Sequence, residues 1–280
     1  MTNKITGAFT ACSDPLSKKC DSLALRMEEL GVPIKMGRYL YSEASARDKA
    51  EELNDFFRDE SISEIFDLSG GDLAVTLVPY LDFESIARSK ARFWGYSDLT
   101  AIINAIYTKT GRVSSLYHLP NISLINKDRL SAFIKGENLS FADFPVKLIK
   151  GSGMKGVLVG GNIRCLLKLA GTDNFPDMSK KILVIESYSA GKRQVYSMLS
   201  QLALMGVFDR CAGVVIGSFT KLEKTDPGVY EYISGIISSF NAKLPIAVTS
   251  FIGHGIDAHP IQIGREYEIT PEGAVVITYE

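Results

Sequence analysis

Histidine is scarce in this sequence, so a histidine that acts as a general base must be His118, His254 or His259. His118 lies in an extended run, and His259 directly precedes Pro260, which restricts its backbone, so structural, packing or surface roles suit these two. His254 follows the apolar run 246–250 and stands between two glycines, which leave the backbone free to aim the ring into a cleft. The local sequence leaves a catalytic and a structural role for His254 open.

A serine that could act as a nucleophile follows the apolar residues that lead to Gly95. Ser97 stands two residues after this glycine, and a helical pattern begins at Leu99. A serine at a strand-to-helix turn resembles a nucleophile elbow, in which the hydroxyl is exposed and the helix N-terminus faces the developing negative charge. An α/β-hydrolase elbow has glycine where this chain has Leu99. The other interpretation, which the turn considered alone favours, is that Ser97 or Asp98 only caps the helix.

A carboxylate stands at the end of another predicted strand. Glu186 follows the apolar run 182–185, and a charge at the tip of a buried strand is costly unless it is paired or placed at a site. Ser97, Glu186 and His254 each stand at a predicted strand end. Together these residue types supply a nucleophile, a group that orients the base, and the base itself. The combination predicts the chemistry of a serine hydrolase.

The elements that would position these residues begin with an alternating pattern over the first 120 residues. Helical faces are predicted over 18–30 and 44–58, and extended stretches over 32–36 and 62–68. This order predicts a parallel sheet covered by helices, with a ligand site beyond the carboxyl ends of its strands. Gly70-Gly71 falls at such an end.

Residues 121–155 interrupt this pattern with polar and turn residues, and we expect a connecting segment with one short helix and one strand. A second α/β unit follows, and its predicted elements are strands near 156–160, 182–186, 213–218 and 246–250, helices near 162–170, 192–206 and 227–240, and short strands from 261 to 279. The expected organisation is an N-terminal domain over 1–120, the connecting segment, and a C-terminal domain over 156–280.

Composition excludes several classes of protein. With 280 residues, of which 46% are hydrophobic and 22% charged, the chain is neither disordered nor a coiled coil. With a net charge of −1, the chain does not have the excess of basic residues that is typical of nucleic-acid binders. Residues 151–156 have the letters G-x-G-x-x-G, but a strand pattern follows, so we expect a turn and no nucleotide site. No His/Cys cluster has metal-ligand spacing.

The expected location is the cytoplasm. The four cysteines lie far apart, which favours free thiols in a reducing compartment, and Cys165 and Cys211 are expected in the core. The N-terminus has no apolar run of signal-peptide length, and no segment approaches the length of a membrane span. We expect a soluble protein without a membrane or nucleic-acid partner.

Several short blocks of the sequence carry a family resemblance. They are Ser69-Gly70-Gly71, Gly95-Tyr96-Ser97-Asp98-Leu99-Thr100, Gly160-Gly161-Asn162, Gly171-Thr172, Leu183-Val184-Ile185-Glu186, the helix end from Gln201-Leu202 to Gly206, and Gly253-His254-Gly255. In these blocks the chain resembles the LD-carboxypeptidase family of serine peptidases, which includes muropeptide LD-carboxypeptidases and microcin C immunity proteins. The resemblance runs from about residue 46 to 269, and the order and spacing of the blocks make it specific.

The resemblance implies a role for each matched residue. Ser97 falls on the family's nucleophile, Glu186 on its carboxylate and His254 on its base. Gly71 and Asp98 fall where two backbone N–H groups form the oxyanion hole. The resemblance also implies an α/β fold, with a parallel, flavodoxin- or Rossmann-like N-terminal domain and a smaller C-terminal domain of the swivelling β/β/α type. It further implies a homodimer and no metal or organic cofactor.

The chain departs from the carboxypeptidase branch beside the two glycines. That branch usually carries Arg before them and Tyr after them, whereas this chain has Ser69 and Asp72. Gly70 and Asp72 are candidate substrate-binding residues, and the charge of Asp72 would repel a substrate carboxylate. Ser187 stands where an acidic residue is common, and residues 106–111 resemble the immunity-protein branch instead.

The expected function is that of an LD-carboxypeptidase, which cleaves the terminal D-amino acid from muropeptides during peptidoglycan recycling. Two alternatives remain open at this point. One is hydrolysis of a microcin C-type peptidyl nucleotide for self-immunity. The other is non-catalytic ligand binding by a relative that kept the fold.

Overall fold

The structure is a computed structural model, and it describes residues 6–120 and 145–278. The chain divides into two compact units, Met1–Leu139 and Ser140–Glu280, each of which is described by itself. Most of the connecting segment predicted over 121–155 lies outside the described residues. The C-terminal unit, expected to be the smaller, is of similar length, because the strands at Lys147–Lys150 and Met154–Asn162 belong to its sheet.

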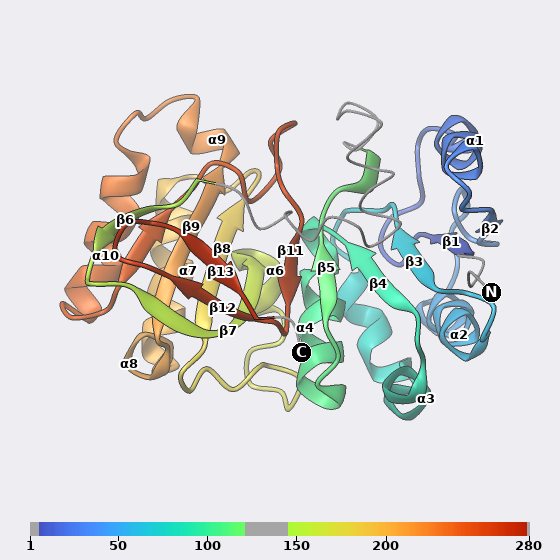
Figure 1. Cartoon of the computed structure of the whole chain (residues 1–280), viewed down its shortest axis with the longest axis horizontal. Helices are drawn as coiled ribbons and strands as arrows, with labels where there is room; N and C mark the ends of the chain where they lie inside the picture. The colour runs from blue at the N-terminus through green and yellow to red at the C-terminus, as the bar shows by residue number, and fades with distance from the viewer. Residues whose placement is uncertain (1–5, 121–144, 279–280) are drawn as a thin grey trace. The chain divides into compact units, whose positions relative to one another are not determined.

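The N-terminal unit is built on a parallel sheet. Its strands are β1 (Gly7–Thr10), β2 (Ile34–Met36), β3 (Glu64–Asp67), β4 (Arg92–Gly95) and β5 (Ser114–Leu116). They lie side by side in the order β5-β4-β3-β1-β2, as Figure 1 shows. Because Thr10 pairs with Asp67, and Phe66 with Trp94, the chain segments that follow β1, β3 and β4 leave the sheet at one edge. This edge is where the sequence predicts the ligand site.

The described residues of the N-terminal unit form four α-helices, and the first, second and fourth of them lie where the sequence predicts helical patterns. The four are α1 (Asp21–Glu29), α2 (Ala46–Arg58), α3 (Phe83–Arg88) and α4 (Thr100–Thr110), with two 3₁₀ segments, η1 (Ala74–Tyr80) and η2 (Ser97–Leu99). Helix α2 begins after Ser45, whose hydroxyl accepts from the amide of Asp48. Its apolar residues Ala50, Leu53 and Phe57 are buried, and Ala46 at its start is half-buried. Helix α3 packs against both α2 and α4.

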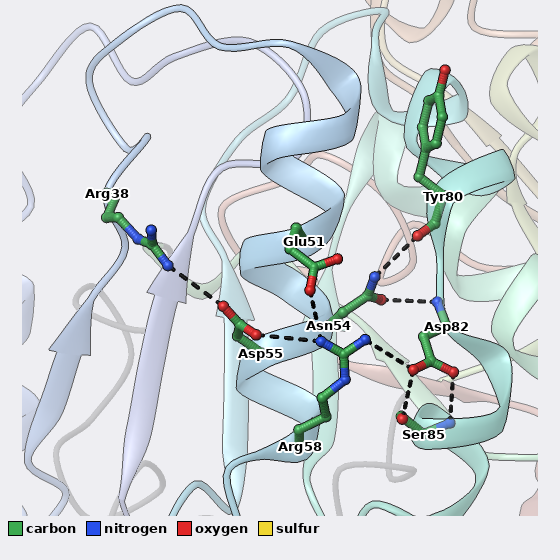
Figure 2. Close-up of polar contacts among 8 residues, drawn as sticks. All are labelled: Arg38, Glu51, Asn54, Asp55, Arg58, Tyr80, Asp82 and Ser85. Atoms are coloured by element: carbon green, nitrogen blue, oxygen red, sulfur yellow. Dashed lines mark hydrogen bonds and ion pairs between the residues drawn. The ribbon is translucent and has the colours of Figure 1, made fainter.

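A polar network on the surface joins α2 to the start of α3 (Figure 2). Arg58 forms an ion pair with Asp82 at 2.9 Å, and Asp82 in turn accepts from the amide of Ser85 and so caps α3. Asn54 binds the main chain between the helices, because its side chain donates to the carbonyl of Tyr80 and accepts from the amide of Asp82. The hydrogen bonds from Ser85 hold the pKa of Asp82 below its usual range. This network fixes the packing of α2 against α3. It lies away from the edge of the sheet at which the loop after β3 begins.

The C-terminal unit has a mixed sheet. Its strands are β6 (Lys147–Lys150), β7 (Met154–Asn162), β8 (Ile182–Ser187), β9 (Gly213–Phe219), β10 (Ile246–Val248), β12 (Glu266–Ile269) and β13 (Val275–Ile277), in the order β13-β12-β7-β8-β9-β10-β6. The four strands from β7 to β10 are parallel, and the flanking strands β6, β12 and β13 pair antiparallel. A further strand, β11 (Ile261–Ile263), precedes β12 in the chain.

Helices of the C-terminal unit follow its parallel strands. They are α6 (Ile163–Leu167), α7 (Lys192–Leu204), α8 (Val207–Arg210), α9 (Thr220–Glu223) and α10 (Val229–Phe240). The helices and strands predicted from 156 onward are confirmed, with ends that differ by a few residues. Residues 151–153 form the turn between β6 and β7, as the absence of a following helix predicted.

The α/β fold class is confirmed, with a parallel-strand sheet in the N-terminal unit and a second sheet in the C-terminal unit. All four cysteines are free and buried, which agrees with the core positions expected for Cys165 and Cys211. Over residues 6–120 and 145–278, no helix combines the length and the apolar character that crossing a membrane requires.

Candidate active site

Ser97 lies in a strained turn at the end of β4. Its φ of 51° places a non-glycine residue in the left-handed region, which among the described residues happens elsewhere only at Lys180. Such strain costs on the order of 1–3 kcal/mol and persists where the surrounding structure imposes it. The side chain is partly exposed, and the turn leads through η2 directly into α4. This strand, tight turn and helix are the context that a nucleophile elbow requires.

Leu99 stands where an α/β-hydrolase elbow has its second glycine, and the tight turn forms here with leucine at that position. A Cβ on Gly95 would lie 2.6 Å from the Cβ of Leu99, so the close crossing of β4 and the helix depends on the glycine of the strand. Leu99 is also the N-cap residue of α4, and neither Ser97 nor Asp98 occupies that position. The structure therefore does not support the interpretation that these residues only cap α4.

The loop after β3 approaches its neighbours so closely that it needs glycine. Gly71 has a φ of 136°, and a Cβ there would overlap the carboxylate of Asp14. At Gly70 a Cβ would lie 3.3 Å from the hydroxyl oxygen of Tyr96, the residue before Ser97. The loop with the two glycines thus lies beside the turn of the candidate nucleophile. Asp72 follows and is exposed.

Ser69 is buried and points into the unit. Its hydroxyl donates to Asp67 Oδ1 at 2.6 Å and accepts from the amide of Ser13 at 2.9 Å. Asp67 also accepts from the amide of Cys12 at 2.7 Å. Burial raises the pKa of Asp67 to about 6, although these hydrogen bonds act in the opposite direction. Ser69 therefore holds the loop through hydrogen bonds that its hydroxyl makes within the protein.

Glu186 and His254 form a hydrogen-bonded pair in the C-terminal unit. Glu186 lies near the end of β8, and its Oε2 is 2.7 Å from Nδ1 of His254. The side chain of Glu186 is 2% exposed and that of His254 11%. A carboxylate on Nδ1 favours the tautomer with the proton on that nitrogen, which leaves Nε2 to accept a proton. The pair has the geometry of a base and the group that orients it.

The backbone at Gly253 packs closely against Glu186 and its neighbour Ser218. The φ of Gly253 is 131°, and a Cβ there would overlap the hydroxyl of Ser218 and lie 3.2 Å from Oε2 of Glu186. The glycine before His254 is thus required by close packing as well as by backbone conformation. The expectation that glycine frees the backbone at this position agrees with both observations.

Tyr188 is a residue of this site that the sequence did not single out. Its ring lies 5.0 Å from that of His254, centroid to centroid, and 57% of the residue is exposed. The available signal was its position two residues after Glu186. An aromatic side chain there covers part of the imidazole.

The other two histidines make ring contacts with neighbouring aromatic residues. His118 stacks on Tyr96 with a centroid distance of 3.9 Å, and His259 meets Phe251 edge-on at 5.5 Å. These contacts are what packing roles predict. Of the candidate residues, the structure places the Gly70-Gly71 loop beside the turn of Ser97 and Asp98 within the N-terminal unit, and joins Glu186 to His254 within the C-terminal unit.

Two known proteins illustrate the sequence similarity of this chain to its relatives. A probable murein peptide carboxypeptidase of Bacillus subtilis (strain 168) is 28% identical over 229 residues, which cover 76% of this chain and 71% of the relative. The microcin C7 self-immunity protein MccF of Escherichia coli is 25% identical over 63% of this chain and 62% of its own length.

Solved structures resemble this chain over nearly its whole length. An MccF-like protein from Bacillus anthracis str. Ames has a TM-score of 0.84 at 24% identity, over 99% of this chain and 97% of that one. MccF in complex with glutamyl sulfamoyl guanosine has a TM-score of 0.81 at 19% identity, over 100% and 97% of the two chains. The family description LD-carboxypeptidase N-terminal domain matches residues 8–118, and LD-carboxypeptidase C-terminal domain matches residues 155–269. This protein belongs to the LD-carboxypeptidase family.

Proposed function

We propose that this protein is a serine carboxypeptidase with a Ser97–Glu186–His254 triad, which works without a metal ion or organic cofactor. The observation that carries the proposal is the 2.7 Å contact between Glu186 and His254. A buried carboxylate that holds an imidazole by Nδ1 serves a general base, and family membership supplies Ser97 as the group on which that base acts. The strained turn of Ser97 supports its part.

In the proposed reaction, Ser97 Oγ attacks the carbonyl carbon of the scissile amide while His254 Nε2 takes the hydroxyl proton. Glu186 stabilises the imidazolium that forms. The N–H groups of Gly71 and Asp98 donate to the tetrahedral oxyanion. When this intermediate collapses, the C–N bond breaks and His254 protonates the departing amine. Water then attacks the acyl-enzyme with the same base, and the free acid leaves.

The proposed substrate is a muropeptide with a terminal D-amino acid, cleaved in the cytoplasm during peptidoglycan recycling. The relatives named murein peptide carboxypeptidases support this choice. Gly70 and the exposed Asp72 are proposed to border the bound peptide. Because Asp72 is acidic, it would disfavour a carboxylate beside it and favour an amino group. We propose a homodimer as the working assembly.

A second candidate activity is hydrolysis of a microcin C-type peptidyl nucleotide. The similarity to MccF, solved with a sulfamoyl nucleotide, favours it. Both activities need the same triad and differ in the leaving group. A non-catalytic ligand-binding relative is the third possibility, and it predicts that Ser97 does not react.

The test uses the purified protein with a defined murein tetrapeptide and, separately, a peptidyl sulfamoyl adenosine. Release of D-alanine supports the first activity, and release of the sulfamoyl adenosine from the peptide supports the second. Ser97→Ala must abolish either one, and activity must persist in a chelator. A fluorophosphonate should label Ser97 in the wild type. Turnover of neither compound together with no labelling would remove the hydrolase proposal and leave ligand binding.

A further inference from the structure

Four buried polar residues form a continuous hydrogen-bonded chain at the carboxyl edge of the N-terminal sheet. They are Ser13, Asp67, Ser69 and Asp98, and each is 2% exposed or less. Asp67 binds the hydroxyl of Ser69, Ser69 accepts from the amide of Ser13, and the hydroxyl of Ser13 donates to Asp98 Oδ2 at 2.8 Å. Hydroxyl and carboxyl groups this deeply buried are costly unless they are hydrogen-bonded, so the chain defines one arrangement of the loops it connects.

Ser13 holds both ends of the loop that carries the two glycines. Its amide binds the side chain of Ser69 at the start of the loop, and its hydroxyl accepts from the amide of Leu73 at 3.1 Å at the end. Lys49 donates to the carbonyl of Ser13 and fixes this residue in turn. The loop from Ser69 to Leu73 is therefore clamped on either side of Gly71.

Asp98 joins this clamp to the turn of Ser97. A single oxygen of its carboxylate, Oδ2, accepts from Ser13 Oγ and from the amide of Ala74, both at 2.8 Å. Asp98 directly follows Ser97 in the chain. Its side chain thus fixes the segment after Gly71 relative to its own backbone.

This connection matters because two backbone N–H groups act together only when their geometry is held to within a fraction of an ångström. Glycine at position 71 has the broadest conformational freedom of any residue type, so its N–H direction depends on how the flanking residues are held. The clamp supplies that restraint.

We propose that Ser13 and the Asp98 side chain are positioning residues, which align the Gly71 N–H with the Asp98 N–H so that both donate to one oxyanion. The inference rests on the proposed function, because it takes these two N–H groups as the oxyanion hole. It adds that Asp98 acts twice, through its backbone as a donor and through its carboxylate as the group that places the other donor.

The test compares Asp98→Ala with Asp98→Asn. Alanine removes the acceptor of both hydrogen bonds, whereas the amide oxygen of asparagine can accept both, because both donors reach the same oxygen. We expect Asp98→Ala to lower kcat about 100- to 1000-fold with KM within about threefold, and Asp98→Asn to stay within about tenfold of the wild-type kcat. The labelling rate of Ser97 by a fluorophosphonate should fall in parallel with kcat.

Ser13→Ala keeps the inference testable if Asp98→Ala fails to fold, and it should lower kcat at least about tenfold at unchanged KM. Its matched control is Ser114→Ala, another buried serine of the same unit, which begins β5 and whose hydroxyl has no hydrogen-bond partner among the described residues. Circular dichroism and melting temperature verify folding of each variant.

The results separate this inference from the proposed function. A wild type that neither turns over substrate nor labels at Ser97 overturns both. A labelled, active wild type with Ser13→Ala and any folded Asp98→Ala at wild-type kcat overturns only the positioning role. A rise in KM without a fall in kcat overturns it as well, because it indicates lost ground-state binding. Equal loss in Asp98→Asn and Asp98→Ala also overturns it, since the two hydrogen bonds that the amide oxygen can accept would then not account for the loss.

Discussion

Glu186 Oε2 and His254 Nδ1 lie 2.7 Å apart although 68 residues separate them in the chain. Glu186 lies near the carboxyl end of β8 and is almost fully buried, while His254 follows β10 in a segment with glycine on both sides. A buried carboxylate with an imidazole partner is stable as long as the hydrogen bond persists. The relationship therefore ties the stability of the C-terminal unit to the orientation of one histidine.

Replacing Glu186 with Gln should lower kcat about 1,000- to 10,000-fold, as loss of the orienting carboxylate does in serine proteases. The amide keeps the size of the side chain but cannot stabilise an imidazolium. The measurement is kcat and KM on whichever proposed substrate the wild type hydrolyses, with the melting temperature as the check on folding. A folded Glu186→Gln variant with kcat within tenfold of the wild type would exclude this role for Glu186.

Replacing His254 with Ala should lower kcat by several orders of magnitude, because the general base is lost. The fold should survive at a lower melting temperature, because the ring covers little core area but its loss leaves the buried carboxylate of Glu186 without this partner. His118→Ala and His259→Ala are the controls and should keep most of the activity, because their rings pack against Tyr96 and Phe251. Similar rates in all three variants would remove His254 from the mechanism.

Replacing Gly253 with Ala should impair both stability and activity. The new methyl group would overlap the hydroxyl of Ser218 and crowd Oε2 of Glu186, in a backbone conformation that alanine rarely adopts. We expect a loss of more than about 1 kcal/mol in unfolding free energy and a clear fall in kcat.

The control for Gly253→Ala is Gly235→Ala. Gly235 lies exposed within α10, and a Cβ there would meet nothing within 4 Å. Alanine should raise stability there by about 0.5–1 kcal/mol and leave kcat unchanged. If Gly253→Ala behaves like this control in urea unfolding and in the activity assay, close packing at Gly253 affects neither stability nor activity.

The sequence predicted the elements whose patterns are local. The apolar face of α2 and the turn between β6 and β7 follow from residue spacing alone, and so does the position of Glu186 at a strand end. The roles of Ser13 and Ser69 could not be predicted in this way. Their hydrogen bonds join loops that follow different strands, so they depend on strand order. Strand β1, which places Ser13, covers only four residues and leaves a weak pattern.

Tyr188 was missed for a different reason. An exposed aromatic residue has no periodic pattern, and its contact with His254 exists only because the ends of β8 and β10 lie on the same sheet. Ser69 differs in type from the arginine that the carboxypeptidase branch usually carries at this position. The sequence does not show that Ser69 is buried and donates a hydrogen bond to Asp67 within the protein.

The network of Figure 2 predicts small effects on stability and none on activity. Asp82→Ala removes the cap of α3 and should cost about 1 kcal/mol of unfolding free energy. Arg58→Gln should cost less than about 1 kcal/mol, because the guanidinium is 41% exposed and solvent weakens its ion pairs. Urea unfolding measures both. A loss of kcat in either folded variant would show that helix packing here affects the candidate site.

Asp67 should make folding more favourable at low pH. Burial raises the pKa of this carboxyl to about 6, against 3.8 for an ordinary aspartate. Below pH 3.8 the group is protonated in both states. Between pH 3.8 and 6 the unfolded chain releases the proton and the folded chain keeps it, so the unfolding free energy falls as pH rises. Above pH 6 both states are ionised, and the full loss is about 3 kcal/mol.

The measurement is urea unfolding of the wild type and of Asp67→Asn, a variant that does not titrate at this position. The difference in unfolding free energy, wild type minus variant, should be roughly 2 kcal/mol larger at pH 4 than at pH 7 and constant above that pH. Burial also raises the pKa of Glu64 in the same sheet, but this residue is present in both proteins and cancels in the difference. A difference that is independent of pH would show that folding leaves the pKa of Asp67 unchanged. A difference that grows as pH rises would show that folding lowers this pKa, because the hydrogen bonds from Cys12 and Ser69 outweigh burial.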